Sequence, residues 1–300
     1  MFKKILLLTM LLVSIGHTKD NIVVYNAYGN NHQVIVQGRM ERKRDFKRVS
    51  KDDGLFRNLW RRIKQVKADD IKSANIDFSI NNETFKTKGD DEGYFEFNVT
   101  TKQLLPMGVQ KIVLNIEGNK NMHETHATIV DNTPLIGIIS DFDDTIIVSD
   151  VSNKISLGVN TMFKNYKQRT LVPTMLERFQ KILAQNPKGM PSTLFILSGS
   201  PQQLFKPVEN FLEYQHFPQH TLILKKAHGE NLDPLTDQFA YKAQKIERLI
   251  KLYPNIQWLM FGDSGEKDYQ VYKAIKEKYP KKVKSYFIRN VKSGEIKEYD

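Results

Sequence analysis

Polar and apolar residues recur with different periodicities in the two halves of this chain. Between residues 21 and 131, apolar residues alternate with polar ones over short runs, which is typical of strands with one buried face. Turn residues separate these runs, so the pattern predicts a β-sandwich-like domain. The predicted strands are 22–25, 33–36, 76–80, 93–99, 111–116 and 125–130.

From residue 134 onward, short runs that are apolar throughout alternate with segments of helical periodicity. This alternation indicates an α/β fold whose parallel sheet is covered by helices on both faces. We find no insertion long enough for a full cap domain and expect little or no cap. The predicted strands are 136–140, 194–197, 221–224, 258–261 and 283–288, and the predicted helices are 154–167, 172–185, 201–214, 240–252 and 267–278.

The domain boundaries follow from local composition. Residues 1–18 carry two lysines followed by an apolar run, which is typical of a signal peptide, with an uncleaved anchor as the alternative. Turn residues at 131–134 separate a β-sandwich-like domain (19–132) from the α/β domain (133–300). The leader predicts a periplasmic or secreted protein of a bacterium.

The amino-acid composition limits the kinds of site and partner that the chain can have. The absence of cysteine excludes disulfides, thiolate metal sites and a cysteine nucleophile. The net charge of +11 indicates either a soluble basic surface or attraction to anionic partners. Residues 55–66 form a basic amphipathic pattern, which either packs on the sandwich or makes peripheral contact with an anionic membrane. The basic residues are dispersed without a stacking motif, so we do not expect nucleic-acid binding.

Candidate chemistry lies where the predicted strands end. The apolar run 135–139 is followed by Asp141 and Asp143, which can both turn toward one point at the carboxyl edge of the sheet. Carboxylates that close repel each other unless a cation lies between them, and Mg²⁺ is the divalent ion best suited to oxygen ligands beside a phosphate. Two later apolar runs end in Ser198 and Asp263 in the same way.

The three strand ends read SDFDDTI, LSGSP and GDSGEKD, in that order. Together they resemble the haloacid dehalogenase superfamily of phosphatases. Within it they are similar to the catalytic domain of the fungal actin-patch-associated phosphatidate phosphatases and their bacterial relatives. The resemblance implies a HAD-like (Rossmannoid) parallel-sheet domain and a Mg²⁺-dependent phosphomonoester hydrolase that works through an aspartyl-phosphate.

The resemblance also implies residue roles. Asp141 is the nucleophile, Asp143 the general acid and base, and Thr145 fixes Asp143 and its loop. A lysine steadies the phosphate and Asp141, and its position in the family corresponds to Lys242, with Lys245 as the alternative.

The remaining motif residues are expected to bind phosphate and metal. Ser198 hydrogen-bonds a phosphoryl oxygen, while Gly199 and Ser200 let the backbone approach the substrate. The metal set implied by the family comprises Asp141, Asp143 through its backbone carbonyl, Asp263, and Asp268 through the metal's waters.

The substrate is therefore expected to be a phosphomonoester, with phosphatidate or another anionic lipid favoured by the resemblance. Two alternatives remain. One is a phosphatase of soluble phosphoesters or phosphoproteins. The other is a secreted binding protein whose phosphatase domain is vestigial.

Overall fold

A computed structural model describes residues 20–42, 71–148, 167, 169–226 and 238–300 of the chain. The predicted signal peptide, the basic amphipathic segment 55–66 and almost all of the predicted helix 154–167 lie outside these residues. In the described helices, none is both long and apolar enough to cross a bilayer.

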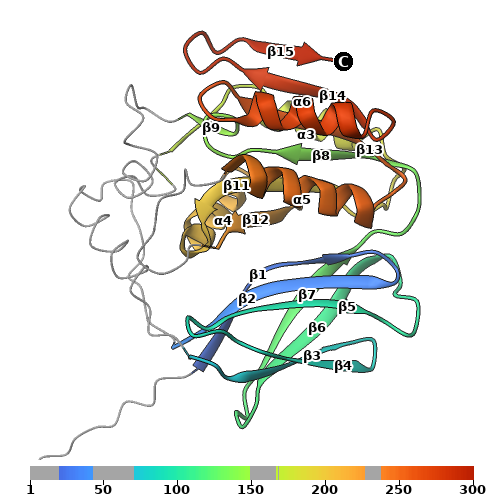
Figure 1. Cartoon of the computed structure of the whole chain (residues 1–300), viewed down its shortest axis with the longest axis vertical. Coiled ribbons are helices and arrows are strands. Elements are labelled where there is room, and N and C mark those ends of the chain that lie inside the picture. The colour runs from blue at the N-terminus through green and yellow to red at the C-terminus, as the bar shows by residue number, and fades with distance from the viewer. Residues whose placement is uncertain (1–19, 43–70, 149–166, 168, 227–237) are drawn as a thin grey trace, which may run out of the picture.

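The N-terminal half is one seven-stranded sheet (Figure 1). Its strand order is β4-β3-β6-β7-β1-β2-β5. β1 and β7 are parallel, and all the remaining neighbouring pairs are antiparallel. The strands are β1 Asp20–Gly29, β2 Gln33–Arg42, β3 Asn75–Ile80, β4 Glu83–Lys88, β5 Tyr94–Thr100, β6 Gly108–Ile116 and β7 Met122–Ile129.

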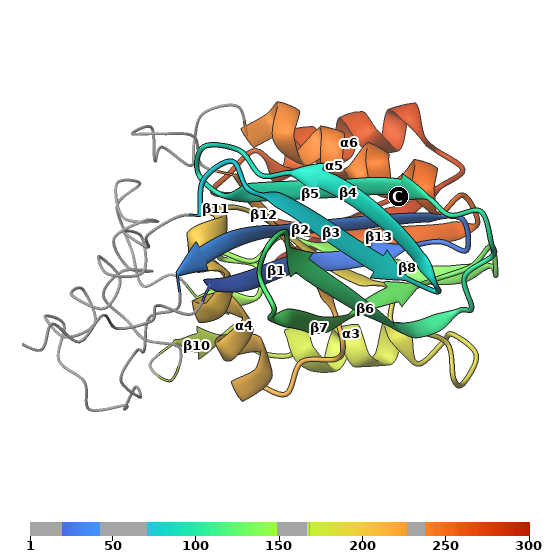
Figure 2. The same ribbon diagram turned by 90° about the horizontal axis from the view of Figure 1, so that it is seen from below.

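This sheet differs from the predicted sandwich, which has two separate sheets. The hydrogen-bonded ladder runs from β7 into β1 at Tyr28 and Gly29, and so joins what would have been the two layers. A bulge in β1 between Val24 and Asn26 increases the local twist. The coiled sheet brings β4 and β5 into contact (Figure 2). It encloses an apolar core that includes Phe78.

The C-terminal half contains a six-stranded sheet of order β12-β11-β8-β13-β14-β15. All neighbouring pairs are parallel except β14 with β15. The strands are β8 Leu135–Ser140, β11 Leu194–Pro201, β12 Thr221–Lys225, β13 Ile256–Asp263, β14 Val283–Arg289 and β15 Ile296–Tyr299, and the short pair β9 Ile147–Val148 and β10 Thr170–Leu171 follows β8 in the chain.

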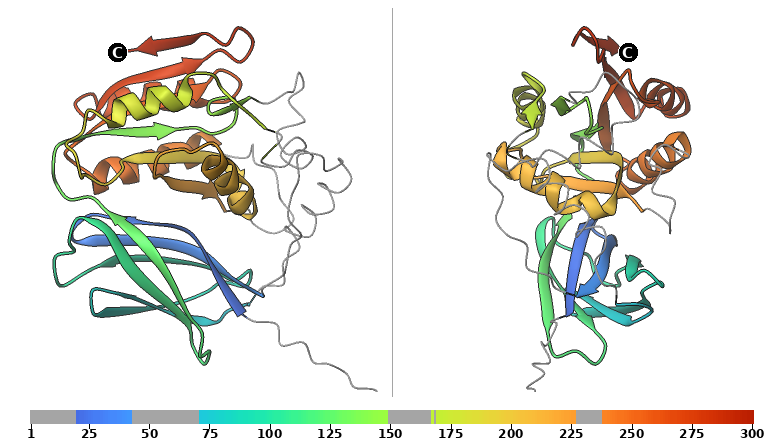
Figure 3. Two further views of the ribbon diagram at one scale, coloured as in Figure 1. Left: turned by 180° about the vertical axis from the view of Figure 1, so that it is seen from behind. Right: turned by 90° about the vertical axis from the view of Figure 1, so that its left-hand side faces the viewer.

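Helices cover both faces of this sheet, as predicted (Figure 3). The central strand β8 shows why: Ile138 is buried in one apolar cluster and Ile139 in the other. One face carries α3 Met175–Leu183 and α4 Phe205–Tyr214, which follows the short 3₁₀ helix Gln202–Leu204; the other carries α5 Gln238–Leu252 and α6 Asp268–Lys278.

The two halves share a buried interface. Strand β1 lies next to β12, and the Tyr28 ring packs edge-on against Phe195 with 5.6 Å between ring centroids. The Tyr253 hydroxyl donates a hydrogen bond of 3.1 Å to the carbonyl of Gly29. Tyr28 belongs to the same buried cluster as Trp258 of β13, so the apolar core is continuous between the two sheets.

Candidate active site

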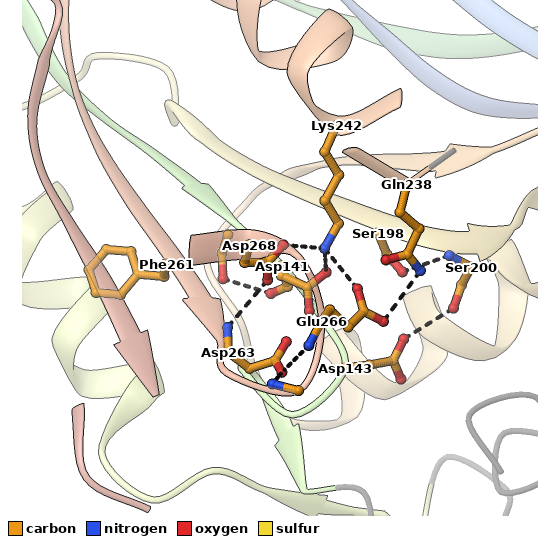
Figure 4. A network of polar contacts seen from close by, with 12 residues as sticks. Asp141, Asp143, Ser198, Ser200, Gln238, Lys242, Phe261, Asp263, Glu266 and Asp268 are labelled. Carbon is orange, nitrogen blue, oxygen red and sulfur yellow. Dashed lines mark hydrogen bonds and ion pairs between the residues drawn. The ribbon is translucent and has the colours of Figure 1, made fainter. Parts of the chain in front are cut away.

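Three parallel strands deliver polar side chains to one edge of the C-terminal sheet (Figure 4). Asp141 follows β8, Ser198 lies in β11 and Asp263 ends β13, and all three are buried. The backbone N–H of Asp141 donates to the carbonyl of Phe261 at 2.8 Å, which fixes the end of β8 against β13. The structure therefore places Asp141, Ser198 and Asp263 at the same edge of the sheet.

Lys242 is the centre of the polar network. It comes from α5, its side chain is 1% exposed, and its ammonium lies 2.8 Å from Asp141 Oδ1, 3.0 Å from Glu266 Oε2 and 2.5 Å from Asp268 Oδ1. Burial lowers the pKa of this ammonium, but the carboxylates, chiefly Asp141 and Asp268, raise it well above the usual value. Lys242 thus stays charged. Lys245 lies outside this network and lines a separate cavity.

Three carboxylates converge without filling their hydrogen-bonding capacity. Asp141, Asp263 and Glu266 each place one oxygen within 4.8 Å of the others. In the described part of the chain, Asp141 Oδ2 and Asp263 Oδ2 are buried and accept no hydrogen bond. The pKa of Asp263 is raised to about 8, mainly by burial and further by the charges of Asp268 and Glu266.

This donor set fits a small hard cation. Mg²⁺ prefers oxygen ligands, and among the described residues no group donates a hydrogen bond to either of the two buried carboxylate oxygens. A divalent ion would also offset the repulsion that raises the Asp263 pKa. The cluster includes Asp141 and Asp263 of the predicted metal set and adds Glu266. It does not include the carboxylate of Asp268, which Lys242 and the backbone N–H of Asp263 hold instead.

Asp143 lies beside this cluster and not within it. Its Oδ2 accepts a hydrogen bond of 3.1 Å from the Ser200 hydroxyl. Burial, and then the charge of Glu266, raises the pKa of Asp143 to about 6, against the opposing influence of Arg169. The next residue, Asp144, has a φ of 57°, a left-handed conformation that turns the chain away from the sheet directly after Asp143.

The predicted phosphate-binding loop lies next to Asp143. The Ser198 hydroxyl accepts a hydrogen bond of 3.0 Å from the Ser200 backbone N–H. A Cβ added to Gly199 would lie 2.9 Å from the side-chain nitrogen of Gln238, so Gly199 faces Gln238 closely. Thr145 is fully buried, and within the described ranges its hydroxyl has no hydrogen-bond partner, so no bond to Asp143 is seen.

Sequence reasoning did not single out Glu266, Gln238 or Arg169. Glu266 turns inward because Asp263 Oδ1 accepts hydrogen bonds from the backbone N–H groups of Gly265 and Glu266. A carboxylate within GDSGEKD was a visible signal for Glu266. Gln238 and Arg169 lie in no motif, and only the fold brings them to the site.

The chain is similar to known proteins over its C-terminal half. The family described as the catalytic domain of phosphatidate phosphatase APP1 matches residues 136–290. Phosphatidate phosphatase APP1 of Saccharomyces cerevisiae is 26% identical over 155 residues, which are 51% of this chain and 26% of that protein. An uncharacterized protein of Schizosaccharomyces pombe is 25% identical over 160 residues, which are 53% of this chain and 26% of that protein. The chain thus spans about a quarter of the length of the curated relatives it matches.

Similarity to solved structures is weak. A carbohydrate acetylesterase from Xanthomonas citri aligns with 91% of this chain and 68% of its own, at 10% identity and a TM-score of 0.31. At that level the alignment says nothing about the site, and the family match carries the assignment. Over its matched residues, which make up just over half of its length, the chain belongs to the phosphatidate phosphatase APP1 catalytic-domain family.

Proposed function

We propose that this chain is a Mg²⁺-dependent phosphomonoester hydrolase of the HAD type, with a phosphatidate-like anionic lipid as its substrate. One observation carries the proposal. The Asp141 carboxylate lies at the end of the central strand, where Lys242 binds Oδ1, Oδ2 is buried without a hydrogen-bond partner among the described residues, and one oxygen lies within 4.8 Å of an oxygen of Asp263 and of Glu266. Membership of the APP1 family supports the reaction class.

In this proposal Asp141 attacks phosphorus and forms an aspartyl-phosphate. Phosphate monoesters hydrolyse extremely slowly in water, so the attacking carboxylate has to be ionised and held in place. Burial raises the pKa of Asp141 well above its usual value, and the charge of Lys242 opposes this rise. The hydrogen bond from Lys242 also fixes the carboxylate, and a bound Mg²⁺ would favour its ionised form further. Ser198 lies in the adjacent strand, where its hydroxyl can bind a phosphoryl oxygen.

Asp143 is placed to protonate the leaving oxygen and then to deprotonate the hydrolytic water. A group with this double role needs a pKa near the working pH, and the burial that raises the pKa of Asp143 to about 6 meets that requirement. Ser200 orients its carboxyl group through the 3.1 Å hydrogen bond.

Asp141, Asp263 and Glu266 are the side chains that would hold Mg²⁺. When bound, the ion supplies positive charge that offsets the repulsion between the carboxylate nucleophile and the anionic phosphate. Lys242 and Asp268 lie on the side of Asp141 where the ammonium already neutralises the carboxylate.

The test is a phosphate-release assay on the full chain with phosphatidate in detergent micelles and with a soluble aryl phosphate, each with and without Mg²⁺. We expect release that depends on Mg²⁺, is faster with phosphatidate, and falls by about a thousandfold, roughly 4 kcal/mol of transition-state stabilisation, in Asp141→Asn. Faster release from the soluble ester would favour a phosphatase of soluble phosphoesters. Activity that survives in Asp141→Asn would exclude the aspartyl-phosphate route.

A further inference from the structure

Arg289 is a buried cation at the carboxyl end of β14. It is the last residue of that strand, it is 9% exposed, and it pairs in register with Asp263 of β13. Its guanidinium donates a hydrogen bond of 2.9 Å to the backbone carbonyl of Asp144. Burial of a guanidinium is costly unless its N–H groups find acceptors, so this contact directs the side chain to the loop that follows β8.

The contact joins the ends of two strands that are not neighbours. β13 lies between β8 and β14 and pairs with both in parallel. The guanidinium of Arg289 therefore reaches past the end of β13 to the loop after β8. The backbone of Arg289 also holds the loop after β13, because its carbonyl accepts a hydrogen bond of 2.9 Å from the N–H of Ser264. Arg289 thus binds both the residue after Asp143 and the residue after Asp263.

The loop after β8 is a tight turn with an unfavourable backbone conformation at its centre. Asp144 has a φ of 57°, in the left-handed region that residues with a Cβ rarely adopt. Two hydrogen bonds close the turn, because the N–H groups of Ile146 and Ile147 donate to the carbonyl of Phe142 at 2.9 and 3.2 Å. Asp143 lies inside this turn, so the position of its carboxyl group depends on contacts that keep the turn in shape. The hydrogen bond from Arg289 is one of them.

The contact between Arg289 and this turn acts on geometry. Glu266 and Arg169 supply the largest charge effects on the pKa of Asp143. Arg289 instead binds a neutral carbonyl in the next residue of the chain. A general acid works only within hydrogen-bond distance of the oxygen that it protonates, and its correct placement is worth about a hundredfold or more in rate.

We propose that Arg289 is a positioning residue, which holds the turn 142–147 so that the Asp143 carboxyl group meets the leaving oxygen of the substrate. This rests on the proposed phosphatase function. As the bond from Asp141 to phosphorus forms and the bond to the leaving oxygen breaks, the proton of Asp143 passes to that oxygen. Arg289 should therefore matter most for esters whose leaving group has to be protonated.

The first measurement compares two esters in the full-length chain with Mg²⁺ present. Phosphatidate in detergent micelles releases an alcohol and needs the proton, whereas p-nitrophenyl phosphate releases a stable phenolate. In Arg289→Met we expect kcat/KM to fall about a hundredfold with phosphatidate and less than about fivefold with p-nitrophenyl phosphate. This ratio reports the steps up to the aspartyl-phosphate, and the later hydrolysis of that intermediate is common to both esters.

The second measurement is amide hydrogen exchange followed by NMR, which tests the contact independently of activity. In Arg289→Met the amides of Ile146 and Ile147 should exchange about tenfold faster or more, because the turn opens more often. The amide of Ile138, which donates to the carbonyl of Thr193, should keep its native rate.

Lys284→Met is the matched control, since it removes an exposed lysine from the same strand, and it should change neither measurement. Arg289→Lys, which carries a shorter cationic side chain, repeats both measurements if Arg289→Met fails to fold. Equal losses with the two esters, or unchanged exchange at Ile146 and Ile147, overturn the inference. If the native chain hydrolyses neither ester, the phosphatase proposal fails, and hydrogen exchange alone decides whether Arg289 holds the turn.

Discussion

At the scale of single residues, buried carboxyl groups set the properties of the site. Asp143 and Asp263 have folded-state pKa values of about 6 and about 8, well above the ordinary 3.8 of an aspartate. Between pH 4 and 8 the folded chain therefore binds more protons than the unfolded chain. Its free energy of unfolding must fall as the pH rises through this range.

The first prediction concerns this pH dependence. In the presence of EDTA, the melting temperature should decrease from pH 5 to pH 8, because the buried carboxyl groups must ionise without a counter-ion. Addition of Mg²⁺ should raise the melting temperature more at pH 8 than at pH 5. Differential scanning calorimetry at the two pH values checks both trends, and a flat profile in EDTA would contradict the raised pKa values.

The second prediction isolates Asp263. Asp263→Asn removes a buried charge while retaining an oxygen to accept the N–H groups of Gly265 and Glu266. In EDTA at pH 8 the variant should melt about 4 °C higher than the native chain, the shift expected from about 1–2 kcal/mol. It should also lose the stabilisation by Mg²⁺. Asp144→Asn, a neighbouring acid outside the cluster, is the control and should keep the Mg²⁺ response.

The positions of the site residues could be predicted from the sequence only where a motif and a strand end coincide. Asp141, Ser198 and Asp263 come together because parallel strands end at one edge. Glu266 was missed because its direction depends on the turn that Asp263 caps. The choice between Lys242 and Lys245 depends on the rotation of α5, which periodicity alone does not fix.

At the scale of elements, the approach of α6 to β13 decides where Asp268 lies. Gly262 makes this approach possible, since an added Cβ would lie 2.5 Å from the Asp268 Cβ and 2.7 Å from the Tyr272 ring. Asp268 then reaches both Lys242 and the backbone N–H of Asp263.

The third prediction follows from this contact. Gly262→Ala should push α6 away from β13, lower the free energy of unfolding by about 1–3 kcal/mol, and reduce phosphate release at least tenfold. Gly137→Ala is the matched control, because it is crowded by Trp258 in the neighbouring strand and lies at the far end of β8. Urea titrations measure the loss of stability in each variant. Phosphate-release assays at urea concentrations well below both unfolding midpoints measure the loss of activity separately. Equal loss of activity in both variants would mean that Asp268 has no special role.

Strands that bury side chains were predictable, and strands that bury none were not. The strands β8, β11, β12, β13 and β14 read as apolar runs and appear where expected. β4 and β15 were missed because neither strand has a buried side chain. Their sequences therefore carry little of the hydrophobic signal that the other strands show.

At the scale of the whole molecule, the two halves are bound by a buried core and by polar contacts. Tyr28 is 2% exposed and packs with Phe195 and Trp258 in one cluster. Asn30 adds a hydrogen bond of 3.0 Å to the carbonyl of Leu252. A sequence-based boundary near residue 132 marks a turn in the chain, but it does not reveal how much apolar surface lies between the halves.

The fourth prediction tests this interface. Tyr28→Ala should lower the free energy of unfolding by about 3–5 kcal/mol, because it empties a large buried volume. Both halves should still unfold in a single transition, detected by far-ultraviolet circular dichroism and by tryptophan fluorescence. The fragment 133–300 should melt below the full chain. Two separate transitions in the native protein would show that the halves are energetically independent.

Lys242 gives the acidic cluster its own internal counter-ion. Its single ammonium contacts Asp141, Glu266 and Asp268 at once, so these three carboxylates can come together in the folded chain without a metal. Metal uptake then becomes a separate, reversible step governed by the free concentration of the ion around the folded protein. Under the proposed Mg²⁺-dependent function, the chain would be inactive where magnesium is scarce and active once the ion becomes available, without any change in its amount.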